Sequence, residues 1–406
     1  MSTFNIEPGE IVTEGIILDE FRESLEVEGQ LVTEIEPAVT TQNTLNQIEV
    51  ESEGKIQADS TAIQVDGIAT IIENEGLIDG SFNGINLANS DIASAQITNE
   101  GIITSGSRAV NIGGVGGVLI NEDEGLITTR ADPRNGTVYG DVTAQNILIE
   151  NLDDGVIDVG EGLNGDAISL ELGAEVNGSV INQGLVQGRG LPGVANPDNQ
   201  ASAVRLYWVP TSGGDVSIFN GNIENSGTFA AENGPAVIIE ENVEFNGSII
   251  NSGLIEGGDT ENGQLAIDLS GVVNAVEVIN SGEIEGNVIG SENSDLFDST
   301  GGEVDGVVLG GAGDDTLIGG DEDDMLHGGA GDDLLNGGLG DNNLVGGAGA
   351  DQFVLAIGGT NIIGDFEVGI DRFLLDDLTF EQLELTQERV QLKSVYLIPT
   401  TYWQRL

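Results

Sequence analysis

Short runs of apolar residues recur along the first three quarters of the chain, each followed by an Asn, then a Gly, then more apolar residues. The clear copies are IIENEGLI at 71–78, QITNEGII at 96–103, SVINQGLV at 179–186, SIINSGLI at 248–255 and EVINSGEI at 277–284. Apolar and polar residues that alternate over a few positions predict short strands with one buried face. Asn tolerates a left-handed backbone and bonds neighbouring backbone groups, so we expect it to shape a turn.

A second strand pattern, Ala-apolar-x-apolar, lies between these copies. It reads AIQV at 62–65, AVNI at 109–112, AISL at 167–170, AVRL at 203–206, AVII at 236–239 and AIDL at 266–269. Each unit therefore carries at least two short strands, and most units span roughly 22–31 residues, the size of one coil of a parallel β-solenoid. Stacked coils would lie about 4.8 Å apart and bury Ile, Val and Leu. Asn amides from successive coils could then form a ladder.

From residue 301 the period tightens to nine residues. The units read GGEVDGVVL, GGAGDDTLI, GGDEDDMLH, GGAGDDLLN, GGLGDNNLV and GGAGADQFV, and end at 354. Their glycines permit backbone angles and close approaches that a Cβ would block. The apolar residue at position 8 is expected to point into the core; these residues are Leu317, Leu326, Leu335, Leu344 and Phe353.

These units resemble the GGxGxDxUx repeat of RTX, or haemolysin-type calcium-binding, proteins. The resemblance implies a Ca²⁺-dependent parallel β-roll, in which each 18-residue coil holds two repeats and ions lie between successive turns on the same edge. It aligns Asp315, Asp333 and Asp351 on one edge, and Asp324 with Asn342 on the other. Carbonyl and carboxylate oxygens are the ligands that Ca²⁺ prefers. The implied ligand set is Asp315, Asp324, Asp333, Asp351, Asn342 and the turn glycines Gly311, Gly313, Gly320, Gly329, Gly331, Gly338 and Gly340.

The charge of the chain leads to the hypothesis that calcium switches the folding of these repeats. The chain of 406 residues has 70 Asp and Glu against 11 Lys and Arg, a formal net charge of -59. Such a polyanion disfavours nucleic acid and anionic membrane surfaces, and favours cations as partners. Residues 310–351 contain no Lys or Arg. Neighbouring carboxylates at ~4 Å repel by about 1–4 kcal/mol per pair. We therefore expect 301–354 to be unfolded without calcium and to fold when calcium binds.

The segments flanking the repeats complete the predicted organisation. Residues 288–297 look like a degenerate first unit with Asp295 at position 6, and 364–383 resembles the segment that closes many such rolls. The predicted domains are an acidic N-terminal segment or cap at 1–45, a parallel β-helix at 46–287, the β-roll at 288–360 and a closing segment at 361–406. The resemblance implies that this last segment carries a type I (ABC transporter) export signal. The N-terminus shows no cleaved secretory peptide, and no apolar run is long enough to span a membrane.

The predicted fold class is all-β, a parallel β-helix followed by a calcium-dependent parallel β-roll. Over about 50–287 the pattern also resembles the passenger repeats of autotransporter-like surface proteins. We expect a secreted or cell-surface protein that binds calcium and acts as a spacer, adhesin or matrix element, with surface polysaccharide among its conceivable partners. The alternative is a polysaccharide-active lyase or epimerase. No zinc helix or G-x-S-x-G elbow is present, the only histidine is His327, and no catalytic residues are predicted.

Aromatic side chains offer one further candidate contact in the β-helix. Tyr207 and Trp208 lie inside the widest gap between the Asn markers, 182 to 225, which holds GRGLPGVANPDNQ at 188–200 and then RLYWVP. Loops of this kind often carry binding residues, so this insertion is a possible sugar or partner contact, although a packed loop edge is the simpler expectation.

Overall fold

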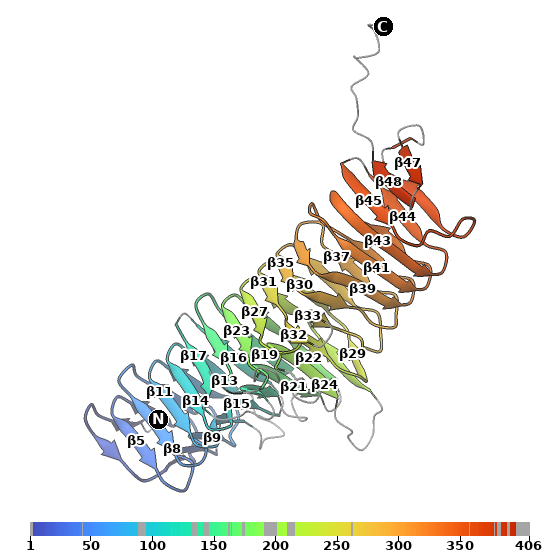
Figure 1. Ribbon diagram of the computed structural model, residues 1–406. Helices are drawn as coiled ribbons and strands as arrows, with labels where there is room; N and C mark the ends of the chain where they lie inside the picture. Colours follow the sequence, from blue (N-terminus) through green and yellow to red (C-terminus); the bar gives the residue numbers. More distant parts are fainter. Residues whose placement is uncertain are drawn as a thin grey trace.

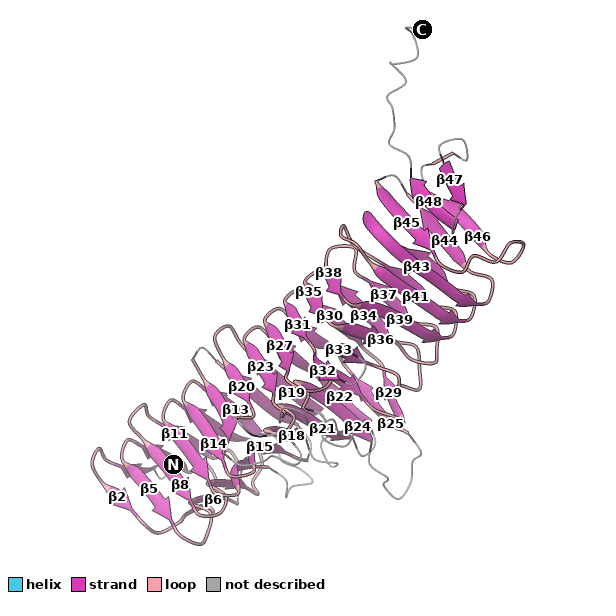
Figure 2. Cartoon of the chain, viewed as in Figure 1, coloured by secondary structure: helices cyan, strands magenta, loops and turns pink. Residues whose placement is uncertain are grey.

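The computed structural model is a single elongated solenoid that runs from the N-terminus at one end to the C-terminal strands at the other (Figure 1). It describes residues 3–394 except 43, 88–94, 115, 123, 131–135, 141–145, 161–162, 164, 173–174, 191–200, 209–215, 261–262, 357, 377, 380–382 and 388–389. Every regular element in this described part is a β-strand (Figure 2). None of the described residues forms a helix with the length and hydrophobicity needed to cross a bilayer.

Sheet A, the first of three sheets that wrap the core, runs the full length of the solenoid and contains 18 strands. In chain order they are β1 (Thr3–Ile6), β4 (Ser24–Val27), β7 (Gln47–Val50), β10 (Thr70–Asn74), β13 (Ala95–Asn99), β16 (Gly117–Asn121), β19 (Asn146–Asn151), β22 (Glu175–Asn182), β25 (Ser217–Asn220), β26 (Ile223–Asn225), β29 (Val243–Phe245), β30 (Ser248–Asn251), β34 (Glu277–Asn280), β37 (Leu296–Asp298), β40 (Thr316–Ile318), β42 (Leu334–Asn336), β44 (Gln352–Leu355) and β46 (Arg372–Leu375).

Sheet B is shorter and ends within the first nonapeptide unit. Its strands are β2 (Ile11–Val12), β5 (Gln30–Thr33), β8 (Lys55–Ala58), β11 (Leu77–Gly80), β14 (Ile102–Ser105), β17 (Leu126–Thr129), β20 (Val156–Asp158), β23 (Leu185–Gly188), β27 (Thr228–Ala231), β31 (Leu254–Glu256), β35 (Glu283–Glu285) and β38 (Glu303–Asp305).

Sheet C also runs the full length and ends in an antiparallel closure. Its strands are β3 (Ile16–Leu18), β6 (Val39–Thr41), β9 (Ile63–Val65), β12 (Asn83–Asn86), β15 (Arg108–Ile112), β18 (Val138–Gly140), β21 (Ile168–Leu172), β24 (Val204–Trp208), β28 (Val237–Ile239), β32 (Gly258–Thr260), β33 (Gly263–Asp268), β36 (Asn287–Ile289), β39 (Val307–Ala312), β41 (Met325–Ala330), β43 (Gly340–Ala348), β45 (Gly359–Ile363), β47 (Leu383–Gln387) and β48 (Val390–Ser394). Strand β48 pairs antiparallel with β45 and so covers the last coil.

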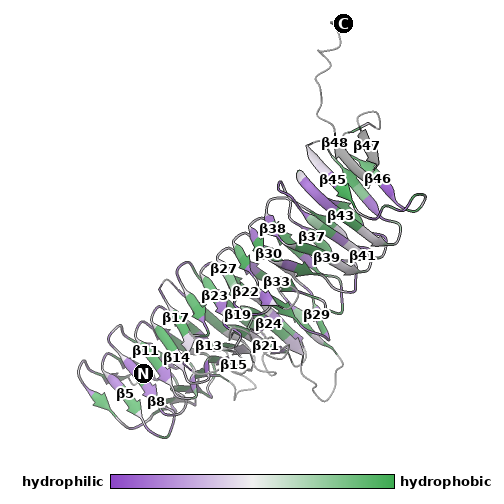
Figure 3. Cartoon of the chain, in the orientation of Figure 1, coloured by the Kyte–Doolittle hydropathy of each residue, from purple (hydrophilic) through white to green (hydrophobic). Residues whose placement is uncertain are grey.

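Most β-helix coils contribute one strand to each sheet, although two coils place two strands in sheet A, β25 with β26 and β29 with β30. The predicted fold class is confirmed. The Asn-x-Gly pattern lies at the corner between sheets A and B, as in β13 and β14, and the Ala-initiated pattern forms sheet C. Hydrophilic and hydrophobic residues both occur along the strands, as the hydropathy colouring of the ribbon shows (Figure 3). The inward residues, such as Ile97, Ile103 and Val110, are fully buried and stack from coil to coil.

The recurring Asn residues form the predicted amide ladder inside the corner between sheets A and B. Asn74 Nδ2 donates to Asn99 Oδ1 at 2.7 Å, and Asn99 Nδ2 donates to Asn121 Oδ1 at 2.7 Å. The chain of bonds continues coil by coil to Asn280, which donates to Ser299 Oγ at 2.9 Å. These buried amides also donate to turn carbonyls, so the corner of each coil is locked to the next.

The solenoid narrows from three sheets to two at Asp305, where sheet B ends. Ile249 pairs with Val278, 29 residues on, whereas Val278 pairs with Phe297, 19 residues on, and Leu317 with Leu335, 18 residues on. Sheets A and C continue in parallel register across this change. The roll is therefore stacked directly on the β-helix.

The predicted core of the roll is confirmed, because Leu317, Leu326, Leu335, Leu344 and Phe353 are at most 1% exposed. The predicted domain boundaries stay predictions. Parallel pairing already precedes residue 46, where β1 pairs with β4 and β4 with β7.

Candidate metal centre

Three aspartates stack along one edge of the roll, where the chain passes from sheet C to sheet A. Asp315, Asp333 and Asp351 end the turns 310–315, 328–333 and 346–351, and each is at most 1% exposed. The backbone N–H of Asp315 donates to Asp333 Oδ1 at 2.8 Å, and that of Asp333 donates to Asp351 Oδ1 at 3.0 Å. The alignment that the 18-residue coil predicts is therefore present, and we name this row the aspartate column.

The column extends beyond the residues with the regular 18-residue spacing. The N–H of Asp295 donates to Asp315 Oδ1 at 2.8 Å, and the N–H of Asp351 donates to Asp371 Oδ1 at 3.0 Å. Both steps span 20 residues, so a strict nine-residue period does not place Asp295 or Asp371 in the column. The sequence signal for Asp295 was position 6 of the degenerate first unit at 288–297, and Asp371 lies in the predicted closing segment at 364–383.

A second row of carboxylates, which the sequence reasoning missed, lies beside the column and bonds in the opposite direction. Asp332 N–H donates to Asp314 Oδ1, and Ala350 N–H donates to Asp332 Oδ1, both at 2.8 Å. Asp314 and Asp332 are at the exposed position 5 of their repeats. Each turn is thus tied to the next by carboxylate bonds that run both ways.

Most of the predicted turn glycines have a backbone that other residues rarely adopt. Gly311, Gly313, Gly329 and Gly331 on the column edge have φ between 106° and 139°. On the other edge, Gly338 and Gly340 have φ of 73° and 78°. Gly347 and Gly349, in turn 346–351 on the column edge, also have positive φ, 104° and 152°, although the predicted ligand set omitted them.

Gly320 differs, because close packing is what requires glycine there. A Cβ at this position would collide with the carbonyl oxygen of Gly302, and it would lie 3.0 Å from that of Ser299.

In turns 310–315 and 328–333, the first glycine faces a pair of acceptor oxygens. A Cβ at Gly328 would collide with Asp333 Oδ2 and lie 2.6 Å from the carbonyl oxygen of Gly346. A Cβ at Gly310 would meet the equivalent pair, Asp315 Oδ2 and the carbonyl oxygen of Gly328. A carboxylate oxygen from one turn and a carbonyl oxygen from the next therefore converge on space that only glycine leaves open.

These oxygens fit a hard divalent cation. Asp315 Oδ2 and Asp333 Oδ2 are buried and have no hydrogen-bond partner among the described residues. Burial raises the pKa of Asp315 to about 7, assisted by the charges of Asp295, Asp333 and Asp314, although the N–H of Asp295 opposes the shift. Burial likewise raises the pKa of Asp333 to about 6. A buried carboxylate oxygen that lacks a hydrogen-bond donor is stabilised by a positively charged partner.

Side-chain carboxylates alone do not make the site. Within the described part of the chain, no three His, Cys, Asp or Glu side chains gather where they could hold a metal ion. The Ca²⁺ shell of 6–8 oxygens would therefore depend on turn carbonyls, which glycine-rich turns leave accessible.

The buried row on the opposite edge of the roll holds one carboxylate and two amides, beside the exposed Asp323 and Asp341. Asp324 N–H donates to Asn342 Oδ1 at 2.9 Å, which confirms that these two residues stack. Asn342 Nδ2 donates to Leu339 O at 2.8 Å and to Asn361 Oδ1 at 3.2 Å. Burial raises the pKa of Asp324 to about 6. The buried row on this edge therefore offers a cation fewer carboxylates than the aspartate column does.

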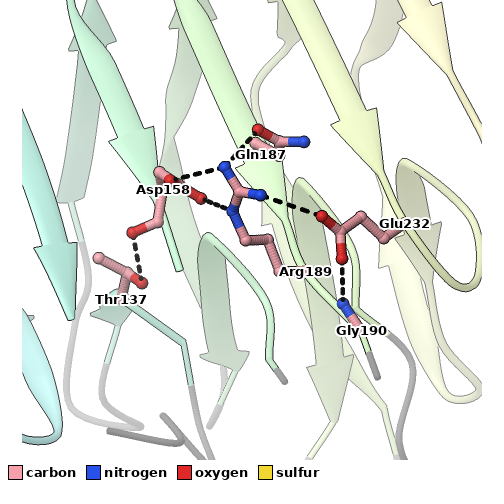
Figure 4. A network of polar contacts seen from close by, with 6 residues as sticks. All are labelled: Thr137, Asp158, Gln187, Arg189, Gly190 and Glu232. Atoms are coloured by element: carbon pink, nitrogen blue, oxygen red, sulfur yellow. Dashed lines mark hydrogen bonds and ion pairs between the residues drawn. The ribbon is translucent and has the colours of Figure 1, made fainter. Parts of the chain in front are cut away.

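The arginines of the β-helix are engaged with acidic or aromatic side chains. Arg189 donates to both carboxylate oxygens of Asp158, at 2.6 and 3.0 Å, and to Glu232 at 3.0 Å (Figure 4). Arg205 bonds Asp166 and Glu240, Arg130 bonds Asp79, and Arg108 stacks on the ring of Tyr139. Arg134 lies outside the described residues. These guanidinium groups serve coil-to-coil contacts.

The two aromatic residues predicted as a contact site are half-buried. Tyr207 donates its hydroxyl to Glu171 at 3.2 Å, and Trp208 packs against the hydrophobic core. The adjoining segments 191–200 and 209–215, and the tail 395–406, lie outside the described residues.

Comparison with known proteins identifies the repeats of the aspartate column. Residues 300–335 and 318–353 match the family model of the RTX calcium-binding nonapeptide repeat, in four copies. No curated protein and no solved structure matches the chain. The family match coincides with the stacked turns of buried aspartates and positive-φ glycines. Residues 300–353 are therefore RTX calcium-binding nonapeptide repeats, which bind Ca²⁺ and form the end of a parallel β-helix.

Proposed function

We propose that Ca²⁺ ions bind between successive turns of the roll and are held by Asp315, Asp333 and Asp351, with Asp324 serving the opposite edge. Carbonyl oxygens of the turn glycines, those of Gly328 and Gly346 among them, complete each shell. The observation that carries this proposal is the pair of buried, unpartnered oxygens, Asp315 Oδ2 and Asp333 Oδ2. Bound calcium supplies the positive charge that offsets the stacked carboxylates.

The same electrostatics make the roll a folding switch. Carboxylates stacked on adjacent turns repel one another, and several such pairs are comparable with the whole stability of a small domain. Metal binding then contributes directly to folding. A calcium titration of the full chain followed by circular dichroism tests this: we expect strand signal to increase as calcium is added. A spectrum that stays constant from zero to about 10 mM calcium would overturn the switch.

We infer that the protein works outside the cell, as a secreted or surface-attached solenoid. Calcium-poor cytosol would leave the roll unfolded during passage through a type I export machine, and calcium outside would fold it. The long β-helix is then a spacer, adhesive or matrix element. Cell fractionation with and without a calcium chelator tests this role, and a protein that stays in the cytosol under both conditions would contradict it.

A structural role is favoured over polysaccharide cleavage. The described arginines between 108 and 205, which could bind an acidic sugar, contact Asp, Glu or Tyr side chains of the chain itself. An activity screen on acidic polysaccharides tests the choice, because depolymerisation by the purified chain would establish an enzyme.

A further inference from the structure

We propose that a calcium ion also binds between turn 290–295 and turn 310–315, so that one ion joins the roll to the last coil of the β-helix. The first of these two turns lies ahead of the matched repeats, which begin at residue 300. The inference rests on the calcium column proposed for 310–351 and adds one ion to it.

Asp295 occupies the same structural position as the aspartates of the column. It directly precedes β37 in sheet A, as Asp315 precedes β40, and Leu296 pairs with Thr316. Asp295 is 6% exposed, and its N–H donates to Asp315 Oδ1 at the 2.8 Å found between Asp315 and Asp333. The turn therefore continues the column in register.

The oxygen pair that marks the repeat turns is also present here. A Cβ at Gly290 would collide with the carbonyl oxygen of Gly310 and lie 2.8 Å from Asp295 Oδ2. Gly310 and Gly328 face the equivalent carboxylate and carbonyl oxygens. The Asp315 carboxylate borders the same gap through Oδ1, which accepts the N–H of Asp295, whereas its unpartnered Oδ2 lies near the carbonyl oxygen of Gly328. The gap between the two turns is thus lined by two buried carboxylates and a turn carbonyl.

Ser291 stands where the repeats have their second glycine, and it orients the Asp295 carboxylate. Ser291 N–H donates to Asp295 Oδ2 at 2.6 Å, and Ser291 Oγ donates to Asp295 Oδ1 at 2.9 Å. A carboxylate offers about four lone-pair directions. The two bonds from Ser291 use two of them and the N–H of Val276 uses a third, which leaves one for a cation.

Asp295 also connects this turn to the β-helix. Its Oδ1 accepts the N–H of Val276 at 2.8 Å, just before β34, the strand that ends in the last ladder residue, Asn280. An ion at Asp295 would therefore stabilise the coil that contains β34, close to the point where sheet B ends. Calcium binding would stabilise the end of the β-helix as well as the roll.

Counting bound calcium in full-length variants tests the site. We expect D295N, which keeps the side-chain shape, to bind one ion fewer than the wild type in equilibrium dialysis at saturating calcium. The matched control is D305N, because Asp305 is exposed at the end of β38 and its substitution removes the same charge. If folded D295N binds as many ions as the wild type, the proposed site does not exist.

Hydrogen exchange of the wild type provides a test that does not depend on the variant folding. We expect calcium to slow exchange of the Ser291 and Asp295 amides by about tenfold or more, as for the amides of 328–333. Protection that begins only at 310 would overturn the proposal. If the wild type binds no calcium at all, the proposed function fails; if it binds calcium and D295N loses none, only this inference fails.

Discussion

The backbone N–H of Asp315 donates a 2.8 Å hydrogen bond to Asp333 Oδ1, one coil further along the roll. This bond occupies one oxygen of Asp333 and leaves Oδ2 buried without a partner. The column is therefore aligned by the protein and completed by a cation. This division would give the roll a defined register while leaving its stability dependent on the proposed calcium ions.

Calcium removal should loosen the roll and spare the β-helix. The β-helix coils are locked by buried amide ladders that carry no charge, such as the bond from Asn121 to Asn151. In hydrogen-exchange mass spectrometry of the full chain, we expect a chelator to speed exchange at 310–355 and leave 70–260 protected. Equal loss of protection in both regions would show that the ladder is not independent of the ions.

Calcium affinity should rise between about pH 5 and pH 7. The pKa values of Asp315 and Asp333 are raised to about 7 and about 6 in the folded chain, so the folded roll holds protons more tightly than the unfolded chain does. The calcium-free roll is therefore most stable at low pH, and it loses stability as pH rises from about 4 to about 7. Protons compete with calcium over the same range.

Isothermal titration at several pH values measures this competition. The double variant D315N/D333N should bind more weakly and show a flatter pH profile. An affinity in the wild type that stays constant from about pH 5 to pH 8 would contradict the burial of these carboxylates.

The substitution G328A should weaken calcium binding by about tenfold, equivalent to about 1.4 kcal/mol. Its Cβ would collide with Asp333 Oδ2 and crowd the carbonyl oxygen of Gly346, which the proposed site uses. G301A is the matched control, because a Cβ there would be 3.5 Å from its nearest neighbour, Ser281 Cβ. Calcium titration of both variants should separate them; equal affinities would show that the space beside Gly328 is not part of the site.

The substitution N151A should destabilise the β-helix without changing calcium binding. Asn151 is 1% exposed and bonds Asn121 and Asn182, so its loss leaves buried polar groups unpaired, at a cost of about 1–3 kcal/mol in the free energy of unfolding. N246A is the control, since Asn246 is exposed. Urea denaturation measures the difference. Equal midpoints for the two variants would mean that the ladder contributes little.

Much of the fold was predictable because stacked coils repeat their inward residues at the spacing of the coil. The Asn positions 74 to 280 predicted the corner ladder, and the nine-residue units predicted the alignment of Asp315 with Asp333 and Asp351. The sequence pattern did not separate the sheet A strand from the sheet B strand of a coil. The Asn-x-Gly turn between them, as between β13 and β14, is too short to interrupt the run of apolar residues.

The sequence alone determined the parallel solenoid, the calcium repeats and the buried Leu and Phe row, because each depends on a local pattern that repeats along the chain. Only the tertiary structure decided where sheet B ends, that Asp295 and Asp371 join the column, and which carboxylate oxygens lack a partner. These features depend on register between coils of unequal length, where 20 residues in one coil stack on 18 in the next, and no local pattern records that register.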